Sequence, residues 1–226
     1  MSEPVLPPIG IRQRGPAPTE TRLLLIRHAE STANAEGVAG GEEGDRGLTP
    51  LGRRQALALA QRLVVTNELS EATALYCSHL PRAQETAAIV AASVRHLSPV
   101  VTHDIDELRV GEGDGLTWAE FERRFGGVDW DVDPTVPNAP GGESLLAFYE
   151  RITSTMRALA ARHPGELVAI VCHGGVIEQM TKFALGLDPG RRIGQRIEHC
   201  SLTEIEHGPA RTRLLRYNEL AGRLAD

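Results

Sequence analysis

The sequence predicts an α/β protein: a single domain with a mostly parallel open sheet and helices on both of its faces. Short apolar runs without alternation, at 22–28 and 166–173, are typical of strands that are buried on both faces. Helix-like segments separate such runs, and this alternation is typical of parallel sheets covered by helices. The 226 residues are enough to bury one large core.

The first half of the chain is expected to alternate between strands at 22–28, 73–78 and 99–103 and helices at 48–65 and 81–94. The first helix has Thr49, a favourable N-cap, and Pro50, which suits the first helical position. The second helix is rich in alanine, the residue with the highest helix propensity. We therefore expect each helix to connect two strands of the sheet.

The second half is expected to contain helices at 117–125, 144–163 and 174–186 and strands at 166–173, 200–207 and 210–218. Thr117 and Glu120 form an S/T-x-x-E capping box at the start of the first of these helices. Apolar residues recur at helical spacing through the second. Residues 126–142 are rich in Gly, Asp and Pro and are expected to form a loop.

The overall composition excludes several classes of function. The 24 basic and 30 acidic residues give a formal net charge of −6, without the basic excess of a nucleic-acid-binding protein. Residues 1–20 contain prolines and charges but no continuous apolar stretch. We expect a flexible N-terminal tail there, rather than a signal peptide or a membrane span, and one domain over 21–226. Neither nucleic acid nor a membrane is an expected partner.

The cysteines indicate a reducing compartment. Cys77, Cys172 and Cys200 are odd in number, and their spacing matches no zinc motif. Cys77 and Cys172 lie in apolar runs and are expected to be small buried side chains. Free cysteines are typical of the cytoplasm, where we expect this protein to be located.

Charged and titratable residues follow four predicted strands at the point where each ends. Arg27 and His28 end the first strand, Arg82 lies just past the second, Glu107 follows the third and His173 ends the fourth. Ligands of open α/β sheets bind at the carboxyl ends of the strands. We therefore expect these five side chains to lie close together.

The five residues have a joint chemical logic, although each alone is more often structural. Two guanidiniums and a cationic histidine can hold a dianionic tetrahedral group, and helix N-termini add backbone N–H donors. A second, neutral histidine can act as nucleophile, and a carboxylic acid can protonate a leaving group. The set predicts phosphoryl transfer through a phosphohistidine.

Six short motifs strengthen this interpretation. In order they are "LIRHAES" followed by Asn34, "LTPLGRRQA", "YCSHLPRAQETA", "DELRVGEGDG", "PGGES" and "VCHGG". Over about residues 22–186 the chain resembles the phosphoglycerate-mutase-like branch of the histidine phosphatase superfamily. The resemblance implies the following site: His28 as the phosphorylated nucleophile, Glu107 as the proton donor, Arg27, Arg82 and His173 as the phosphate pocket, Ser31 and Asn34 lining it, and the amide of Gly174 facing the phosphate.

Other features favour structural interpretations. "GEGDG" at 111–115 lacks the lysine of a P-loop and the spacing of a dinucleotide fingerprint. Asp104, Asp106 and Glu112 are expected to be solvated loop acids. The remaining histidines show no metal-type spacing and are expected to be structural or exposed: His79, His96, His103, His163, His199 and His207. We therefore expect no metal and no cofactor.

The predicted function is metal-independent hydrolysis of a small-molecule phosphomonoester. The first alternative is a phosphoglycerate mutase. Mutases of this branch usually read "HGN", whereas this chain reads "HGG" and has an acidic loop at 42–45, which argue against that activity. The second alternative is a non-catalytic phosphate-binding or adaptor module, and the presence of all five core residues counts against it. The substrate and the formation of a homo-oligomer are left open.

Overall fold

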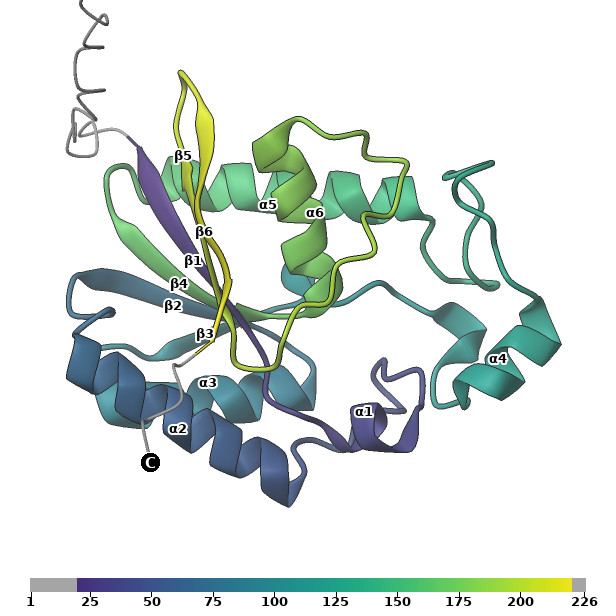
Figure 1. Ribbon diagram of the computed structural model, residues 1–226, viewed down its shortest axis with the longest axis horizontal. Helices are drawn as coiled ribbons and strands as arrows, with labels where there is room; N and C mark the ends of the chain where they lie inside the picture. Colours follow the sequence, from purple (N-terminus) through teal and green to yellow (C-terminus); the bar gives the residue numbers. More distant parts are fainter. Residues whose placement is uncertain (1–19, 221–226) are drawn as a thin grey trace, which may run out of the picture.

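The computed structural model describes residues 20–220, so the tail expected at 1–20 lies outside the described residues, apart from Glu20. Six strands form one sheet in the order β3-β2-β4-β1-β5-β6 (Figure 1). The strands are β1 (Thr21–Arg27), β2 (Ala72–Ser78), β3 (Pro99–Thr102), β4 (Leu167–Cys172), β5 (Leu202–His207) and β6 (Thr212–Glu219). The helices are α1 (Thr32–Glu36), α2 (Pro50–Thr66), α3 (Pro81–Val94), α4 (Trp118–Phe125), α5 (Leu145–Arg162) and α6 (Gly174–Leu185), with short 3-10 helices η1 (His103–Ile105) and η2 (Gly111–Gly113).

Four neighbouring strands of the sheet are parallel. β3, β2, β4 and β1 pair in this way, whereas β5 runs antiparallel to β1 and β6 antiparallel to β5. The register places Arg27 opposite Cys172 and Cys77 opposite Val171. The residues that follow β1, β4 and β2 therefore leave the sheet side by side. The mostly parallel open sheet predicted from the sequence is confirmed.

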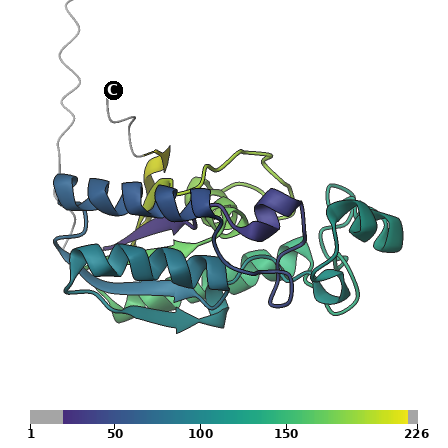
Figure 2. The ribbon, with the colours of Figure 1, turned by 90° about the horizontal axis from the view of Figure 1, so that it is seen from below.

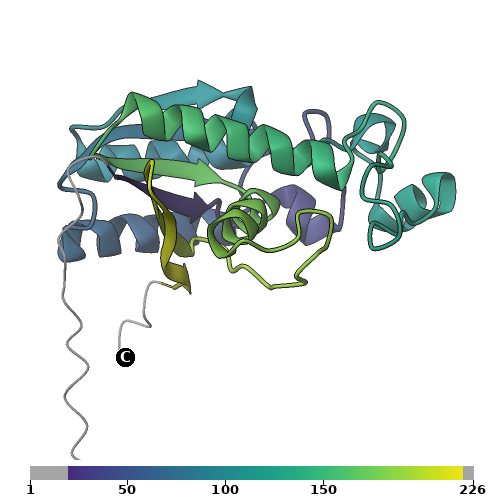
Figure 3. The same cartoon turned by 90° about the horizontal axis from the view of Figure 1, so that it is seen from above.

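Each face of the sheet has its own apolar core. Leu24 and Ile26 pack with residues of α2 and α3, and Leu23 and Leu25 pack with residues of α5 and α6. Figures 2 and 3 show these two helix pairs on opposite faces of the sheet. Successive residues of a strand point to opposite faces, so a strand that is covered on both sides has to be apolar at every position. This explains the uninterrupted apolar run in β1.

The expected strands and helices are present with slightly shifted ends, and α1 is an additional helix. Thr49 caps α2 through its side chain, which accepts a hydrogen bond from Gly52 N–H at 2.9 Å. The expected capping box of Thr117 and Glu120 is formed at α4. α1 and α4 lie beyond the carboxyl ends of the parallel strands (Figure 1). Among residues 20–220, no helix combines the length and the apolar character needed to cross a bilayer.

Candidate active site

His28 has one ring nitrogen tied to the backbone and the other directed at an arginine. Its Nδ1 lies 2.7 Å from the carbonyl oxygen of Ala29, and Arg82 Nε lies 3.2 Å from its Nε2. A carbonyl oxygen only accepts hydrogen bonds and a guanidinium only donates them. Nδ1 therefore carries the proton, and the lone pair available for reaction is on Nε2.

The surroundings of His28 keep its ring neutral. The side chain is only 2% exposed. Burial and the positive charges of Arg82 and other neighbours lower the pKa of His28 well below its usual range. A ring that is neutral at pH 7 keeps its Nε2 lone pair, which is the form that a nucleophile needs.

Arg82 connects the two histidines of the site and is itself fixed by an acid. Its Nε lies 3.2 Å from His28 Nε2 and 3.3 Å from His173 Nδ1. Its Nη1 donates to Asp45 Oδ2 at 2.9 Å and to the carbonyl of Gly40 at 2.8 Å. Asp45 Oδ2 also accepts from the backbone N–H of Arg82 at 3.1 Å. The orientation of Arg82 thus depends on the loop between α1 and α2, which carries Gly40 and Asp45.

Asp45 is a site residue that the sequence did not reveal. Its side chain is fully buried in contact with Arg82, a residue far from it in the sequence. In the sequence Asp45 is one of three acids in a Gly-rich polar loop, where solvated acids are the rule. The buried ion pair shows that Asp45 is a partner of the arginine rather than a solvated charge.

Arg27 and His173 each hold a buried nitrogen without a protein partner. Within residues 20–220, Arg27 Nε and His173 Nε2 make no hydrogen bond. Their other nitrogens are used: Arg27 Nη1 donates to the carbonyl of Ile197, and His173 Nδ1 faces Arg82. An unsatisfied buried donor is costly, so two of them beside Arg82 are typical of a site that receives an anion.

Burial makes His173 neutral, whereas the sequence led us to expect a cationic histidine in the pocket. The ring is 0% exposed, and desolvation together with the charges of Arg82 and Arg27 lowers the pKa of His173 well below its usual range. Because Nδ1 accepts from Arg82, the neutral ring carries its proton on Nε2. His173 can therefore serve an anion as a neutral donor, while the two guanidiniums supply the charge.

Glu107 is held against the start of α6 by backbone groups. Its Oε1 accepts from Leu108 N–H at 2.9 Å and its Oε2 from Gly175 N–H at 2.9 Å. A Cβ atom on residue 175 would collide with Oε1 of Glu107 and crowd the ring of Phe148. The second glycine of "HGG" is thus needed for this approach of the carboxylate to the helix.

Ser31, Asn34 and Gly174, the three residues expected to surround the phosphate, differ from one another in their positions. Ser31 is fully buried, and its Oγ accepts from Asn34 N–H at 3.2 Å as the N-cap of α1. Asn34 lines the central cavity, although its Oδ1 also accepts from Ser31 N–H at 3.2 Å. Gly174 is the first residue of α6 and lies next to Arg27, since a Cβ there would be 3.6 Å from Arg27 Nε.

The central cavity has a volume of about 530 Å³, which suits a small metabolite. Arg27, His28, Arg82 and Glu107 line one part of it. Apolar side chains line it as well, from Leu108, Val110, Trp118, Trp130, Leu145 and Phe148, together with the polar Glu178, Gln179, Arg192 and Gln195. The Arg192 guanidinium lies 4.5 Å from the centre of the Trp130 ring. The cavity thus offers both charged and apolar side chains to a ligand.

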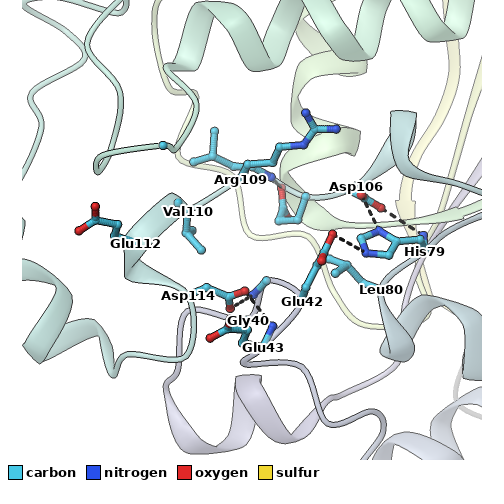
Figure 4. Close-up of a pocket in the computed structure, with 15 residues that line it drawn as sticks. Gly40, Glu42, Glu43, His79, Leu80, Asp106, Arg109, Val110, Glu112 and Asp114 are labelled. Carbon is cyan, nitrogen blue, oxygen red and sulfur yellow. Dashed lines mark hydrogen bonds and ion pairs between the residues drawn. The ribbon is translucent and has the colours of Figure 1, made fainter.

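A second cavity of about 360 Å³ (Figure 4) lies beside the first and shares Gly40, Glu107, Leu108 and Val110 with it.

The prediction that Asp106 is a solvated acid is wrong. Asp106 is 3% exposed and accepts hydrogen bonds from Ser78 Oγ at 2.6 Å and from His79 N–H at 3.1 Å. Both donors lie at the end of β2.

The described residues also contain one group that could hold a metal ion, formed by Glu42, His79 and His103. Both histidines lack metal-type spacing in the sequence, which is why no ligand role was expected of them. Cys77, Cys172 and Cys200 are free and buried, as expected for Cys77 and Cys172, and burial raises the pKa of Cys77 to about 11. The reducing compartment stays a prediction.

Comparisons with known proteins identify similar sequences. A family model of the histidine phosphatase superfamily (branch 1) matches residues 23–220. A phosphoglycerate mutase-like protein 4 of Arabidopsis thaliana is 34% identical over 187 residues, which cover 80% of this chain and 76% of that protein. A metal-independent phosphoserine phosphatase of the same plant is 34% identical over 161 residues, covering 70% of this chain and 66% of that protein.

Solved structures of phosphatases have the same fold. A mycobacterial glucosyl-3-phosphoglycerate phosphatase is 26% identical, with a TM-score of 0.72, and the match covers 88% of this chain and 99% of that one. The α-ribazole phosphatase of Shigella flexneri is 26% identical, with a TM-score of 0.74 and coverage of 88% and 96%. The similarity extends over nearly the whole described chain.

Proposed function

The chain belongs to the histidine phosphatase superfamily, and from this membership we propose that it is a phosphomonoesterase that hydrolyses a small phosphorylated metabolite through a phosphohistidine. The observation that carries the proposal is the state of His28: a buried neutral ring whose Nε2 lone pair faces Arg82. The phosphatases among its relatives support a hydrolase. The site roles, the intermediate and the cytoplasmic location are parts of the proposal.

In the first step, the Nε2 lone pair of His28 attacks phosphorus. Arg82 Nε and the unpartnered N–H groups of Arg27 and His173 would donate to the phosphoryl oxygens. The bond from phosphorus to the ester oxygen breaks, and its electron pair stays on that oxygen. Glu107, which lines the same cavity, gives the oxygen a proton, so that an alcohol leaves.

In the second step, water attacks the phosphohistidine. Glu107, now a carboxylate, takes a proton from the water as the nitrogen–phosphorus bond breaks. The electron pair of that bond returns to Nε2, so His28 is again neutral, Glu107 is again protonated and inorganic phosphate leaves. No redox step or metal ion is needed for this balance.

The distinction between a phosphatase and a mutase can be tested directly. With 3-phosphoglycerate and a bisphosphoglycerate primer, we expect no 2-phosphoglycerate, because we propose that water reaches the phosphohistidine in this cavity. Product analysis by NMR and a phosphate-release assay over a panel of phosphorylated metabolites are the measurements. Isomerisation faster than phosphate release would assign a mutase, and no release from any substrate would favour a binding module.

Treatment with a strong chelator is expected to leave phosphate release unchanged. The reason is that charge stabilisation comes from Arg27 and Arg82, and the nucleophile is a side chain rather than a metal-bound water. The measurement compares the rates before treatment, after treatment and after the readdition of divalent ions. Loss of activity that a divalent ion restores in the wild type and in Glu42→Gln alike would contradict the histidine mechanism.

A further inference from the structure

We propose that Glu42, His79 and His103 form a binding site for a divalent transition-metal ion, separate from the reacting groups. One potential ligand atom of each residue lies within 4.8 Å of those of the other two. His79 follows β2, His103 begins η1 after β3, and Glu42 comes from the loop between α1 and α2. The fold thus brings together three segments that are far apart in the sequence.

His79 is oriented in advance as a ligand. Its Nδ1 lies 2.6 Å from Oδ2 of the buried Asp106. A carboxylate only accepts hydrogen bonds, so Nδ1 is the donor and Nε2 faces away from Asp106. Histidines that bind metals are commonly held in this way by a carboxylate behind the ring, which fixes the tautomer and the ring orientation.

The other ring nitrogen of His79, Nε2, points at the carboxylate of Glu42. It lies 3.1 Å from Glu42 Oε1, and Figure 4 shows Glu42 reaching from its loop toward the ring. Two ligands of a tetrahedral zinc ion with bonds near 2 Å lie about 3.3 Å apart. The separation of these two atoms is therefore close to what one shared ion requires.

His103 supplies the third ligand from an exposed position. Its ring lies against that of His79, with the centroids 3.8 Å apart, and its side chain is 65% exposed. It can therefore turn a nitrogen toward the ion without moving a buried group. Two imidazoles and one carboxylate form a set that suits Zn²⁺ or Co²⁺, whereas Mg²⁺ and Ca²⁺ prefer oxygen ligands.

The ion would stabilise a loop on which the catalytic arginine depends. The same loop carries Gly40 and Asp45, which both accept hydrogen bonds from Arg82. An ion held by Glu42 and the two histidines would pin this loop to the ends of β2 and β3. Because such an ion binds the folded state only, it raises thermal stability without taking part in the reaction.

The test uses the purified full-length chain after removal of metals. Zn²⁺ is titrated by calorimetry, and Co²⁺ is titrated by its visible absorption, which reports a tetrahedral site with nitrogen ligands. At about 100 times Kd, Zn²⁺ is expected to raise Tm by roughly 5–10 °C. Glu42→Gln and His103→Ala are expected to weaken binding by at least about 10-fold. Both side chains are exposed, so these variants should fold.

Matched controls decide the location of the ion. Glu43→Gln removes the neighbouring exposed acid, and His96→Ala removes an exposed histidine outside the cluster. Both should bind as the wild type does, and so should His28→Ala. Loss of binding in His28→Ala with full binding in Glu42→Gln would place the ion at the catalytic histidine and overturn the proposal. Equal affinity in all variants, or no binding by the wild type, would overturn it as well.

Discussion

Replacing His28 with alanine is expected to reduce phosphate release by about 10³-fold or more, because the variant has no nucleophile to accept the phosphoryl group. The wild type, mixed with labelled substrate and quenched, should carry an acid-labile label. The variant should carry none. Its melting temperature and circular dichroism should show a folded protein, since the two apolar cores do not include His28.

His199→Ala is the matched control for this experiment. The His199 ring lies near that of His28, with the centroids 5.6 Å apart, but its Nδ1 faces the backbone carbonyl of His28. This variant should therefore still acquire the label, whatever its rate. A labelled His28→Ala protein, or an unlabelled His199→Ala protein, would show that the phosphoryl acceptor has been assigned to the wrong ring.

Glu107→Gln is expected to slow the cleavage of an alkyl phosphate by about 10²–10⁴-fold. An alkoxide is strongly basic and needs a proton as it leaves, whereas a nitrophenolate leaves readily without one. The loss on a nitrophenyl phosphate should therefore be clearly smaller. This comparison requires the phosphorylation step in burst kinetics, because Glu107 also activates water in the second step, which slows both substrates alike.

Two controls accompany the Glu107 variant. Glutamine has one oxygen, so either Leu108 N–H or Gly175 N–H loses its acceptor, and the melting temperature shows whether the fold tolerates this. Glu112→Gln removes an exposed acid nearby and should leave both rates near those of the wild type. If Glu112→Gln showed the dependence on the leaving group and Glu107→Gln did not, the proton donor would be misplaced, while the chemistry of His28 could stand.

The elements of the sheet could be predicted from the sequence because each depends on a local pattern. β4 and the central residues 23–26 of β1 are apolar without interruption, as in strands covered on both faces, and the starts of α2 and α4 are marked by local caps. α1 could not be predicted from the sequence, because its five residues, TANAE, are too few and too polar to show a helical periodicity of apolar residues. Its capping box of Ser31 and Asn34 uses asparagine in place of the usual acid.

The sequence by itself also determined that several polar residues at strand ends reach the site, because the direction of a parallel strand decides where its last residue lies. Arg27, His28 and His173 could be placed together on this ground alone, and the register of β1 and β4 agrees with that placement. The state of the two histidines could not be predicted in the same way. Their neutral rings depend on burial by segments that are distant in the sequence, and on the guanidinium of Arg82.

Only the tertiary structure decided which of the remaining polar residues are solvated. Asp45 and Asp106 look like ordinary loop acids in the sequence, yet one is buried against Arg82 and the other against His79. The approach of Glu42 to His79 likewise joins two loops that no local pattern relates. Burial and pairing are long-range properties: they depend on which segments the completed fold brings together, and the spacing of residues along the chain does not encode them.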